Sequence, residues 1–247
     1  MSIAKPTIIL VHGAWHGPHL YQSLTSALES AGYTVKAPAL PSVGGEHENF
    51  DADVALVRED IESSVEAGHD VVLLMHSYGG VIGSEAAKGF SRLDKPSGDR
   101  DRGSVVRLIY LAAFALKEKT SLMDGLGGKP LPWWEEIGTT QIKAKDCKEI
   151  FFNDVDQETA DEIIPQLKNH ARGVFSSKIT YAAWKHINST YIVCEQDQAI
   201  PLEVQDMMST QPGNKIEVER LDAGHSPFLS KIAETVKLVR KAIGEKV

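Results

Sequence analysis

The chain is poor in cysteine, in long apolar runs and in basic charge. Its 247 residues include two cysteines, Cys147 and Cys194, too few for a disulfide framework, and we expect free thiols in a reducing, cytoplasmic compartment. The apolar run of residues 7–11 is too short for a signal-peptide core, and no run approaches the ~20 residues of a membrane helix. A net charge of −8, from 26 basic and 34 acidic residues, argues against nucleic acid as a partner.

Several common ligand-binding patterns are also absent. The chain has no internal repeats, no low-complexity tract and no Gly-Lys-Ser/Thr P-loop, and a dinucleotide fingerprint would need glycine where Tyr78 stands. His12, His16 and His19 could suggest a metal site, but their spacing matches no common zinc motif and no carboxylate lies among them. We therefore expect neither a metal nor an organic cofactor.

Short apolar runs alternate with amphipathic helical segments along most of the chain. Residues 7–11 and 71–75 lack polar alternation, which is typical of buried strands. Further strands are expected at 33–40, 105–114, 191–195 and 215–221, and helical stripes at 20–31, 54–65 and 232–243. Asp51 or Asp53 is a candidate cap of the second helix. This alternation predicts an α/β fold, with a mostly parallel central sheet and helices on both faces.

Two segments interrupt the alternation. Residues 94–104 form a polar loop, whereas residues 115–188 contain "GLGGKPLPWWEEIG" and a helical stretch at about 157–170, but no convincing buried strand. We expect 115–188 to be a helical lid (cap) inserted into a core made of residues 1–114 and 189–247. The alternative is an irregular loop-and-helix layer of the same core.

The stretch "VVLLMHSYGG" predicts a nucleophile elbow. A strand ends at His76-Ser77, two glycines follow, and a helical pattern resumes at Val81. A serine in such a tight turn projects its hydroxyl from the sheet edge, and the small residues allow the strand and helix backbones to approach closely. Met75 departs from the G-x-S-x-G pattern, because it stands where the first glycine is usual. The alternative is a strand-to-helix turn with a capping serine.

A serine nucleophile needs a base and an acid that orients the base, and the order expected for this elbow is serine, acid, histidine. "YIVCEQDQAIP" offers Glu195 and Asp197 just after a buried strand, and Asp197 is preferred because it lies in the loop proper. "RLDAGHSPF" offers His225 in a loop after the last strand. The alternatives are a turn or capping aspartate and a surface histidine.

Two further sets of residues complete the predicted site. The backbone N–H groups of Ala14, after the first strand, and of Tyr78, after the nucleophile, would stabilise a developing oxyanion. Four aromatic residues are candidates for an apolar substrate wall, with ordinary core or lid packing as the alternative. These residues are Trp15, Trp133, Trp134 and Phe228.

Four motifs in register resemble the α/β-hydrolase superfamily over essentially the whole chain: "LVHGAWHG", "MHSYGG", "EQDQAIP" and "AGHSPF". "VHGAWHGPHLYQSLTSALESAGYTVKAPAL" is most similar to the branch of small plant-type esterases, which also includes hydroxynitrile lyases. The resemblance implies an α/β-hydrolase fold and the triad Ser77, Asp197 and His225. The lyases are expected to carry lysine directly after the catalytic histidine, and Ser226 at that position favours a hydrolase. A serine nucleophile also disfavours the epoxide hydrolases and dehalogenases, which use aspartate.

These observations predict a serine hydrolase that cleaves a carboxylic ester or lactone of a small, hydrophobic molecule through an acyl-enzyme. The expected partner is that small-molecule substrate, with neither nucleic acid nor a membrane involved, and the motifs do not indicate an oligomeric state. A lyase acting through the same triad and a non-catalytic ligand-binding protein are the alternatives.

Overall fold

A six-stranded parallel sheet forms the centre of the molecule. The computed structural model describes residues 5–94, 101–212 and 216–247. The strand order is β2-β1-β3-β4-β8-β9, and every neighbouring pair is parallel. The six strands are β1 (Thr7–Val11), β2 (Thr34–Lys36), β3 (Val71–His76), β4 (Val105–Leu111), β8 (Ser189–Cys194) and β9 (Ile216–Leu221). The strands inside the sheet are the continuous apolar runs of the sequence, because helices cover both of their faces.

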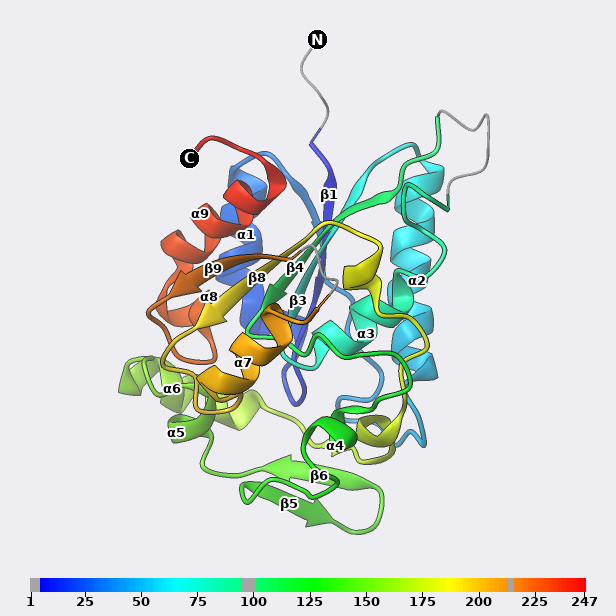
Figure 1. Cartoon of the computed structure of the whole chain (residues 1–247). Helices are drawn as coiled ribbons and strands as arrows, with labels where there is room; N and C mark the ends of the chain where they lie inside the picture. Colours follow the sequence, from blue (N-terminus) through cyan, green and yellow to red (C-terminus); the bar gives the residue numbers. More distant parts are fainter. Residues whose placement is uncertain (1–4, 95–100, 213–215) are drawn as a thin grey trace.

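Helices pack on the two faces of this sheet (Figure 1). One face carries α1 (Gln22–Ser30), preceded by the 3-10 turn η1 (Pro18–Tyr21), together with α8 (Pro227–Ser230) and α9 (Ile232–Ile243). The other face carries α2 (Asp51–Glu66) and α3 (Gly79–Ala86). Helix α7 (Leu202–Ser209) follows β8. The predicted α/β fold and its helical stripes are therefore confirmed.

Several predicted boundaries differ from the structure. Strand β2 has three residues instead of the eight expected at 33–40, and β4 ends at Leu111, where Ala112 takes a positive φ of 42°. Neither Asp51 nor Asp53 caps α2, since both lie within its first turn and Phe50 occupies the N-cap. Residues 95–100 of the predicted polar loop and Lys215 of the last predicted strand lie outside the described residues.

Most of the 115–188 segment lies beyond the carboxyl ends of the core strands, and its last part returns past α3 to the start of β8 (Figure 1). The segment expected to be helical, with no convincing buried strand, also contains β5, β6 and β7, which form a small antiparallel sheet. β5 and β6 are short and partly exposed, and β7 has only two residues, both buried, so none of the three shows an apolar run. The helix expected at 157–170 ends at Ile163, and Pro165 then lies in a 3-10 turn. The elements are α4 (Leu122–Gly125), β5 (Trp134–Ile137), β6 (Gln141–Ala144), α5 (Cys147–Phe151), α6 (Gln157–Ile163), η2 (Ile164–Gln166), β7 (His170–Ala171), η3 (Gly173–Ser176) and η4 (Ala183–Lys185).

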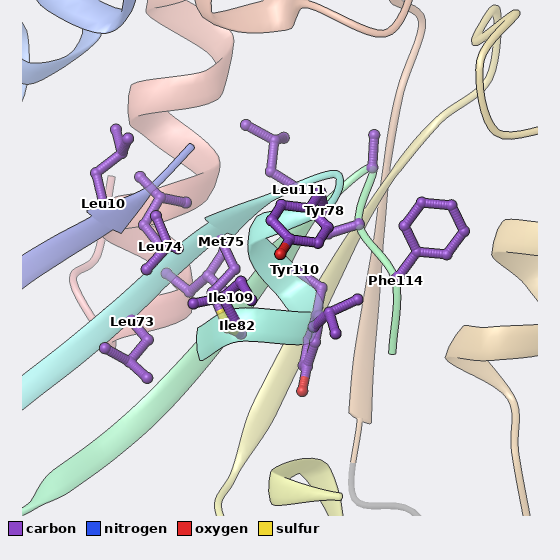
Figure 2. Packing of buried hydrophobic residues seen from close by; sticks show 14 of the residues in the cluster. Leu10, Leu73, Leu74, Met75, Tyr78, Ile82, Ile109, Tyr110, Leu111 and Phe114 are labelled. Atoms are coloured by element: carbon purple, nitrogen blue, oxygen red, sulfur yellow. The ribbon is translucent and has the colours of Figure 1, made fainter. Parts of the chain in front are cut away.

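The bulky Met75 fits at the end of β3 because of a glycine elsewhere. Met75 is fully buried, and Figure 2 shows it beside Ile82 among the apolar side chains of β3, β4 and α3. A Cβ atom on Gly83 would lie 2.4 Å from the Met75 Sδ atom. Gly83, one turn into α3, therefore supplies the space that the elbow pattern usually obtains from a glycine at position 75.

Both cysteines are free thiols, as predicted, and both are buried. No helix in the described ranges is both long and apolar enough to span a membrane.

Candidate active site

Ser77 occupies a strained turn between β3 and α3. Its φ is 53°, in the left-handed region that a residue with a side chain rarely adopts. A Cβ atom on Gly79 would lie 2.1 Å from the Val11 carbonyl oxygen, and one on Gly80 would lie 2.5 Å from that of Phe114. These contacts show why the chain needs glycine at both positions. The strain is held by backbone hydrogen bonds to the Ser77 carbonyl from the N–H groups of Gly80 and Phe114, at 3.0 and 3.1 Å.

Asp197 and His225 form a buried pair at the ends of β8 and β9. His225 Nδ1 lies 2.8 Å from Asp197 Oδ2, and both side chains are almost fully buried. Asp197 Oδ1 accepts the backbone N–H groups of Ala199 and Ile200, at 2.7 and 2.9 Å. Glu195, the other acid considered, faces Arg220 instead. Because the carboxylate oxygens are held in this way, Asp197 can fix the orientation of the His225 ring.

His225 lies beside the elbow through contacts with His76, the neighbour of Ser77. The rings of His76 and His225 are 4.6 Å apart, and His76 Nε2 lies 2.8 Å from the His225 carbonyl oxygen. Within the described residues the Ser77 hydroxyl makes no hydrogen bond to His225. Such catalytic contacts are often loose without substrate and tighten when it binds.

His76 also connects the first loop to His225. Burial lowers the pKa of His76 well below its usual range, so the ring is neutral and carries one proton. A carbonyl oxygen can only accept, so the proton lies on Nε2, and Nδ1 accepts the Tyr21 hydroxyl at 2.7 Å. The same hydroxyl accepts the Gly13 N–H at 3.1 Å. Gly13 and His225 are therefore held by one short chain of hydrogen bonds.

The two predicted oxyanion donors, Ala14 and Tyr78, line a cavity together with Ser77. Within residues 5–94, 101–212 and 216–247, neither backbone N–H donates a hydrogen bond. Trp15, next to Ala14, takes a positive φ of 63°. A free N–H on each side of the serine is the arrangement that stabilises a tetrahedral oxyanion.

The wall of this cavity is aromatic, and it includes Trp15, Trp133 and Trp134. The structure does not place Phe228 on it. Phe228 is fully buried in α8, where its ring stacks on Tyr21 at 4.0 Å and contacts His76 at 5.0 Å. It therefore supports the histidine loop from behind, and its assignment to the substrate wall is wrong.

Sequence reasoning missed other residues of the wall. Phe151 and Phe175 come from short elements of the 115–188 segment. Because both lie far along the chain from the four motifs, nothing in the sequence placed them near the site. The remaining wall residues are Phe114, Leu122, Leu126, Leu131, Ala199 and Ile200. Five of the lining residues also border a second, larger apolar groove along α7, and these are Phe114, Leu126, Leu131, Ala199 and Ile200. The free volume beside Ser77 is ≈ 20 Å³, against ≈ 400 Å³ in the groove.

Two histidines of the first loop, His12 and His16, contact backbone groups through hydrogen bonds. His12 lies 2.9 Å from the Gly13 carbonyl through Nδ1 and accepts the Leu40 N–H through Nε2 at 3.1 Å. His16 Nδ1 lies 2.7 Å from the Ala14 carbonyl. No group of three or more His, Cys, Asp or Glu side chains in the described ranges is arranged to hold a metal ion.

A parallel sheet with a serine at a strand-to-helix elbow, and a buried Asp–His pair at the ends of later strands, defines the class of α/β hydrolases. The model of the alpha/beta hydrolase family matches residues 8–238, and the chain belongs to this family.

The chain is 36% identical to the alpha/beta hydrolase nvfD of Aspergillus novofumigatus (strain IBT 16806), over 98% of each chain. It is 27% identical to methylesterase 7 of Arabidopsis thaliana, over 94% of each chain. Among solved structures, a pyrethroid hydrolase from Sphingobium faniae JZ-2 matches with a TM-score of 0.76 and 23% identity, over 96% of this chain and 97% of the other. The predicted resemblance to the plant-type esterase branch is thereby confirmed.

Proposed function

We propose that the protein hydrolyses a carboxylic ester or lactone through an acyl-enzyme. The observation that carries the proposal is Ser77, held at φ 53° at a strand end that also receives the buried Asp197–His225 pair. Ser77 attacks the carbonyl carbon while His225 takes the hydroxyl proton and returns it to the leaving alcohol. Water then attacks the acyl carbon while His225 takes a proton from the water. The bond to Ser77 Oγ breaks, the acid is released, and His225 returns the proton to Ser77. This chemistry needs neither a metal nor an organic cofactor.

The surrounding groups perform the remaining roles. Asp197 keeps the His225 ring oriented and stabilises its protonated form during each transfer. The backbone N–H groups of Ala14 and Tyr78 stabilise the negative oxygen of the tetrahedral intermediate. Residues 115–188 act as a lid, since this segment contributes Trp133, Trp134, Phe151 and Phe175 to the cavity wall.

The two cavities support an unsymmetrical substrate. The ≈ 20 Å³ beside Ser77 holds about one water-sized group, whereas the ≈ 400 Å³ groove falls in the range that binds a whole small molecule. An ester with one small and one bulky apolar group fits this arrangement. The names of the methylesterase relatives, which point to a small methyl group on one side of the ester, support it further.

A fluorophosphonate probe tests the proposed function. The wild-type protein is expected to take up one probe molecule, found by peptide mass spectrometry on the peptide that contains Ser77. The Ser77→Ala variant is expected to take up none. A wild-type protein that is folded but is not labelled at Ser77 contradicts the proposal.

The same preparation separates the two alternatives. Methyl and aryl esters, lactones and a cyanohydrin are assayed together. Cyanohydrin cleavage without ester turnover would assign a lyase, and absence of any turnover with intact binding of hydrophobic ligands would assign a binding protein. The proposal expects ester or lactone turnover.

Filling the groove should change substrate preference. Val204 lines the groove but not the cavity beside Ser77. We expect Val204→Trp to lower kcat/KM at least tenfold for a bulky apolar methyl ester and to change it less than twofold for methyl acetate, because only the bulky group needs the groove. The control is Val204→Ala, which leaves the groove open and should retain both activities. An equal loss on both esters contradicts the role of the groove.

A further inference from the structure

A second buried polar cluster lies next to the proposed site. It consists of Ser42, Asp53, Tyr78 and His170, each 0 to 1% exposed. Ser42 Oγ lies 2.5 Å from Asp53 Oδ2 and 2.8 Å from His170 Nε2. The Tyr78 hydroxyl donates to Asp53 Oδ2 at 3.0 Å, and the Ser42 N–H donates to Asp53 Oδ1 at 2.9 Å. None of these side-chain contacts includes Ser77, Asp197 or His225.

The cluster contains a serine, a histidine and an aspartate, but it is not a second triad. His170 Nδ1 accepts the Trp15 N–H at 3.1 Å, and burial lowers the pKa of His170 well below its usual range. The neutral ring therefore carries its proton on Nε2 and donates it to Ser42. Ser42 in turn donates its own proton to Asp53. The serine faces no base and no solvent, so it cannot act as a nucleophile.

The hydrogen bonds of the cluster form one continuous chain with two ends. One end is the N–H of Trp15, the residue after Ala14, and the other is the side chain of Tyr78. Their backbones belong to the two segments that carry the free N–H groups beside Ser77. The rings of Tyr78 and His170 also contact each other edge to face, 4.9 Å apart. A single buried network thus links the loop after β1 to the elbow after β3.

Each member is placed by a different element. Ser42 lies in the loop after β2, Asp53 in the first turn of α2, and His170 in β7 of the 115–188 segment. The Ala171 N–H bonds the Ser42 carbonyl at 2.9 Å, and the Lys168 N–H bonds the Trp15 carbonyl at 3.0 Å. Asp53 receives three donors and contacts no acceptor among the described side chains, which is the environment of a carboxylate.

We propose that Asp53, Ser42 and His170 are positioning residues that hold the N–H groups of Ala14 and Tyr78 at the separation that the oxyanion requires. This inference rests on the proposed function. The two donors lie on separate loops, and Trp15 and Ser77 beside them have strained backbones, with φ of 63° and 53°. Without an anchor between the loops, each donor could relax away from the oxyanion.

Tyr78→Phe tests the proposal, because it removes the hydroxyl that reaches Asp53 and keeps the ring and the backbone N–H. Loss of a whole oxyanion donor costs about 10²- to 10³-fold in kcat, and we expect a displaced donor to cost roughly tenfold. KM for a methyl ester should change less than twofold. The inhibition constant of a trifluoromethyl ketone, whose adduct with Ser77 carries an oxyanion, should rise by the same factor as kcat/KM falls.

Tyr110→Phe is the matched control. Tyr110 is another fully buried tyrosine, and its hydroxyl bonds Ser84 at 2.7 Å within the core. This variant should lose comparable stability in urea unfolding and keep wild-type kcat and inhibitor affinity. Asp53→Asn is a second variant, and it should reproduce the kinetic pattern of Tyr78→Phe.

The outcomes are distinct. If Tyr78→Phe keeps kcat and the inhibition constant within twofold of wild type, the network supports only the fold and the proposal is overturned. Equal kinetic losses in Tyr78→Phe and Tyr110→Phe overturn it as well. If the fluorophosphonate does not label the wild-type protein at Ser77, the proposed function is wrong, and this inference, which depends on it, is wrong as well.

Discussion

Alanine in place of Ser77, of His225 or of both is expected to lower kcat for ester hydrolysis by the same factor, roughly 10⁶-fold. The nucleophile is inactive without its base, and every proton transfer assigned to the base depends on attack by that nucleophile. Removing the second residue therefore adds almost nothing to the loss of the first. The residual rate should come from substrate binding and from the N–H groups of Ala14 and Tyr78. Single-turnover assays at matched protein concentration measure all three variants.

Asp197→Asn is expected to have a smaller effect than the alanine variants, because it changes the partner of His225 and leaves Ser77 and His225 in place. Asp197 Oδ2 faces His225 Nδ1, and Oδ1 accepts the N–H groups of Ala199 and Ile200. Asparagine at position 197 replaces one of these two oxygens with an NH₂ group. The imidazole then favours the tautomer that cannot accept the serine proton, and kcat should fall about 10⁴-fold.

Ser226→Ala is the matched control for the triad series. Ser226 is fully buried next to His225, and its hydroxyl has no hydrogen-bond partner among the described residues. Its kcat should remain within a few fold of wild type, with unchanged circular dichroism. If the loss of kcat in the double variant equals the product of the two single losses, Ser77 and His225 do not act as a unit. If Ser77→Ala retains turnover, Ser77 is not the nucleophile.

The second large effect is expected in acid. Four fully buried histidines, His12, His16, His76 and His170, have pKa values below the usual 6.5, and the first cause for each is burial. The pKa is lowered to about 4 for His12 and to about 3 for His16. The unfolded chain therefore binds protons below pH 6.5 that the folded protein does not bind.

The direction of the change in stability with pH follows from the linkage between proton binding and folding. The stability contributed by the neutral histidines is fully present above pH 6.5, decreases as the pH falls below that value, and is fully lost only below the folded-state pKa values. Each histidine lowers the free energy of unfolding by about 1.4 kcal/mol per pH unit inside this window. The four together therefore lower it by roughly 5 kcal/mol between pH 7 and pH 5.5. Asp53 acts in the opposite direction, since burial raises its pKa. A loss of this size is comparable to the whole stability of many domains.

Urea unfolding followed by tryptophan fluorescence at pH 7.5, 6.5 and 5.5 measures the effect. His16→Leu should reduce the pH slope by about a quarter, because it removes one of four titrating groups. Val65→Ala, which removes buried methyl groups and no titrating group, should be less stable at every pH and keep the wild-type slope. Equal unfolding free energies of the wild-type protein at pH 7.5 and 5.5 would contradict the prediction.

The sequence anticipated the core and the order of the motifs because both are local patterns. The buried strands β1, β3 and β8 were visible as apolar runs, and each proposed catalytic residue lies in a loop that directly follows a strand. Parallel strands bring their carboxyl ends to one edge of the sheet, so residues far apart in the chain could be assigned to one site. The bonded pair Asp197–His225 agrees with that assignment.

The errors arose where a residue's role depends on a distant neighbour. Phe228 lies three residues after His225, yet its ring faces Tyr21 and His76 and not the cavity. Asp53 was a candidate helix cap, and the structure instead directs it to Ser42 and Tyr78. The small sheet β5–β6–β7 carries no apolar run, because β5 and β6 are partly exposed and β7 has only two residues.

Met75 shows the same division. In the sequence, Met75 departs from the elbow pattern, because a bulky residue stands where a glycine is usual. The fold places Gly83 against it, and the space that is absent at one position is present at the other. The sequence by itself determined the parallel α/β sheet and the residues at its strand ends, because strand periodicity and turn chemistry are properties of neighbouring residues. Only the tertiary structure decided which side chains line the cavity and which buried network joins Trp15 to Tyr78, because His170 bonds Trp15 and Ser42 from positions 155 and 128 residues away along the chain.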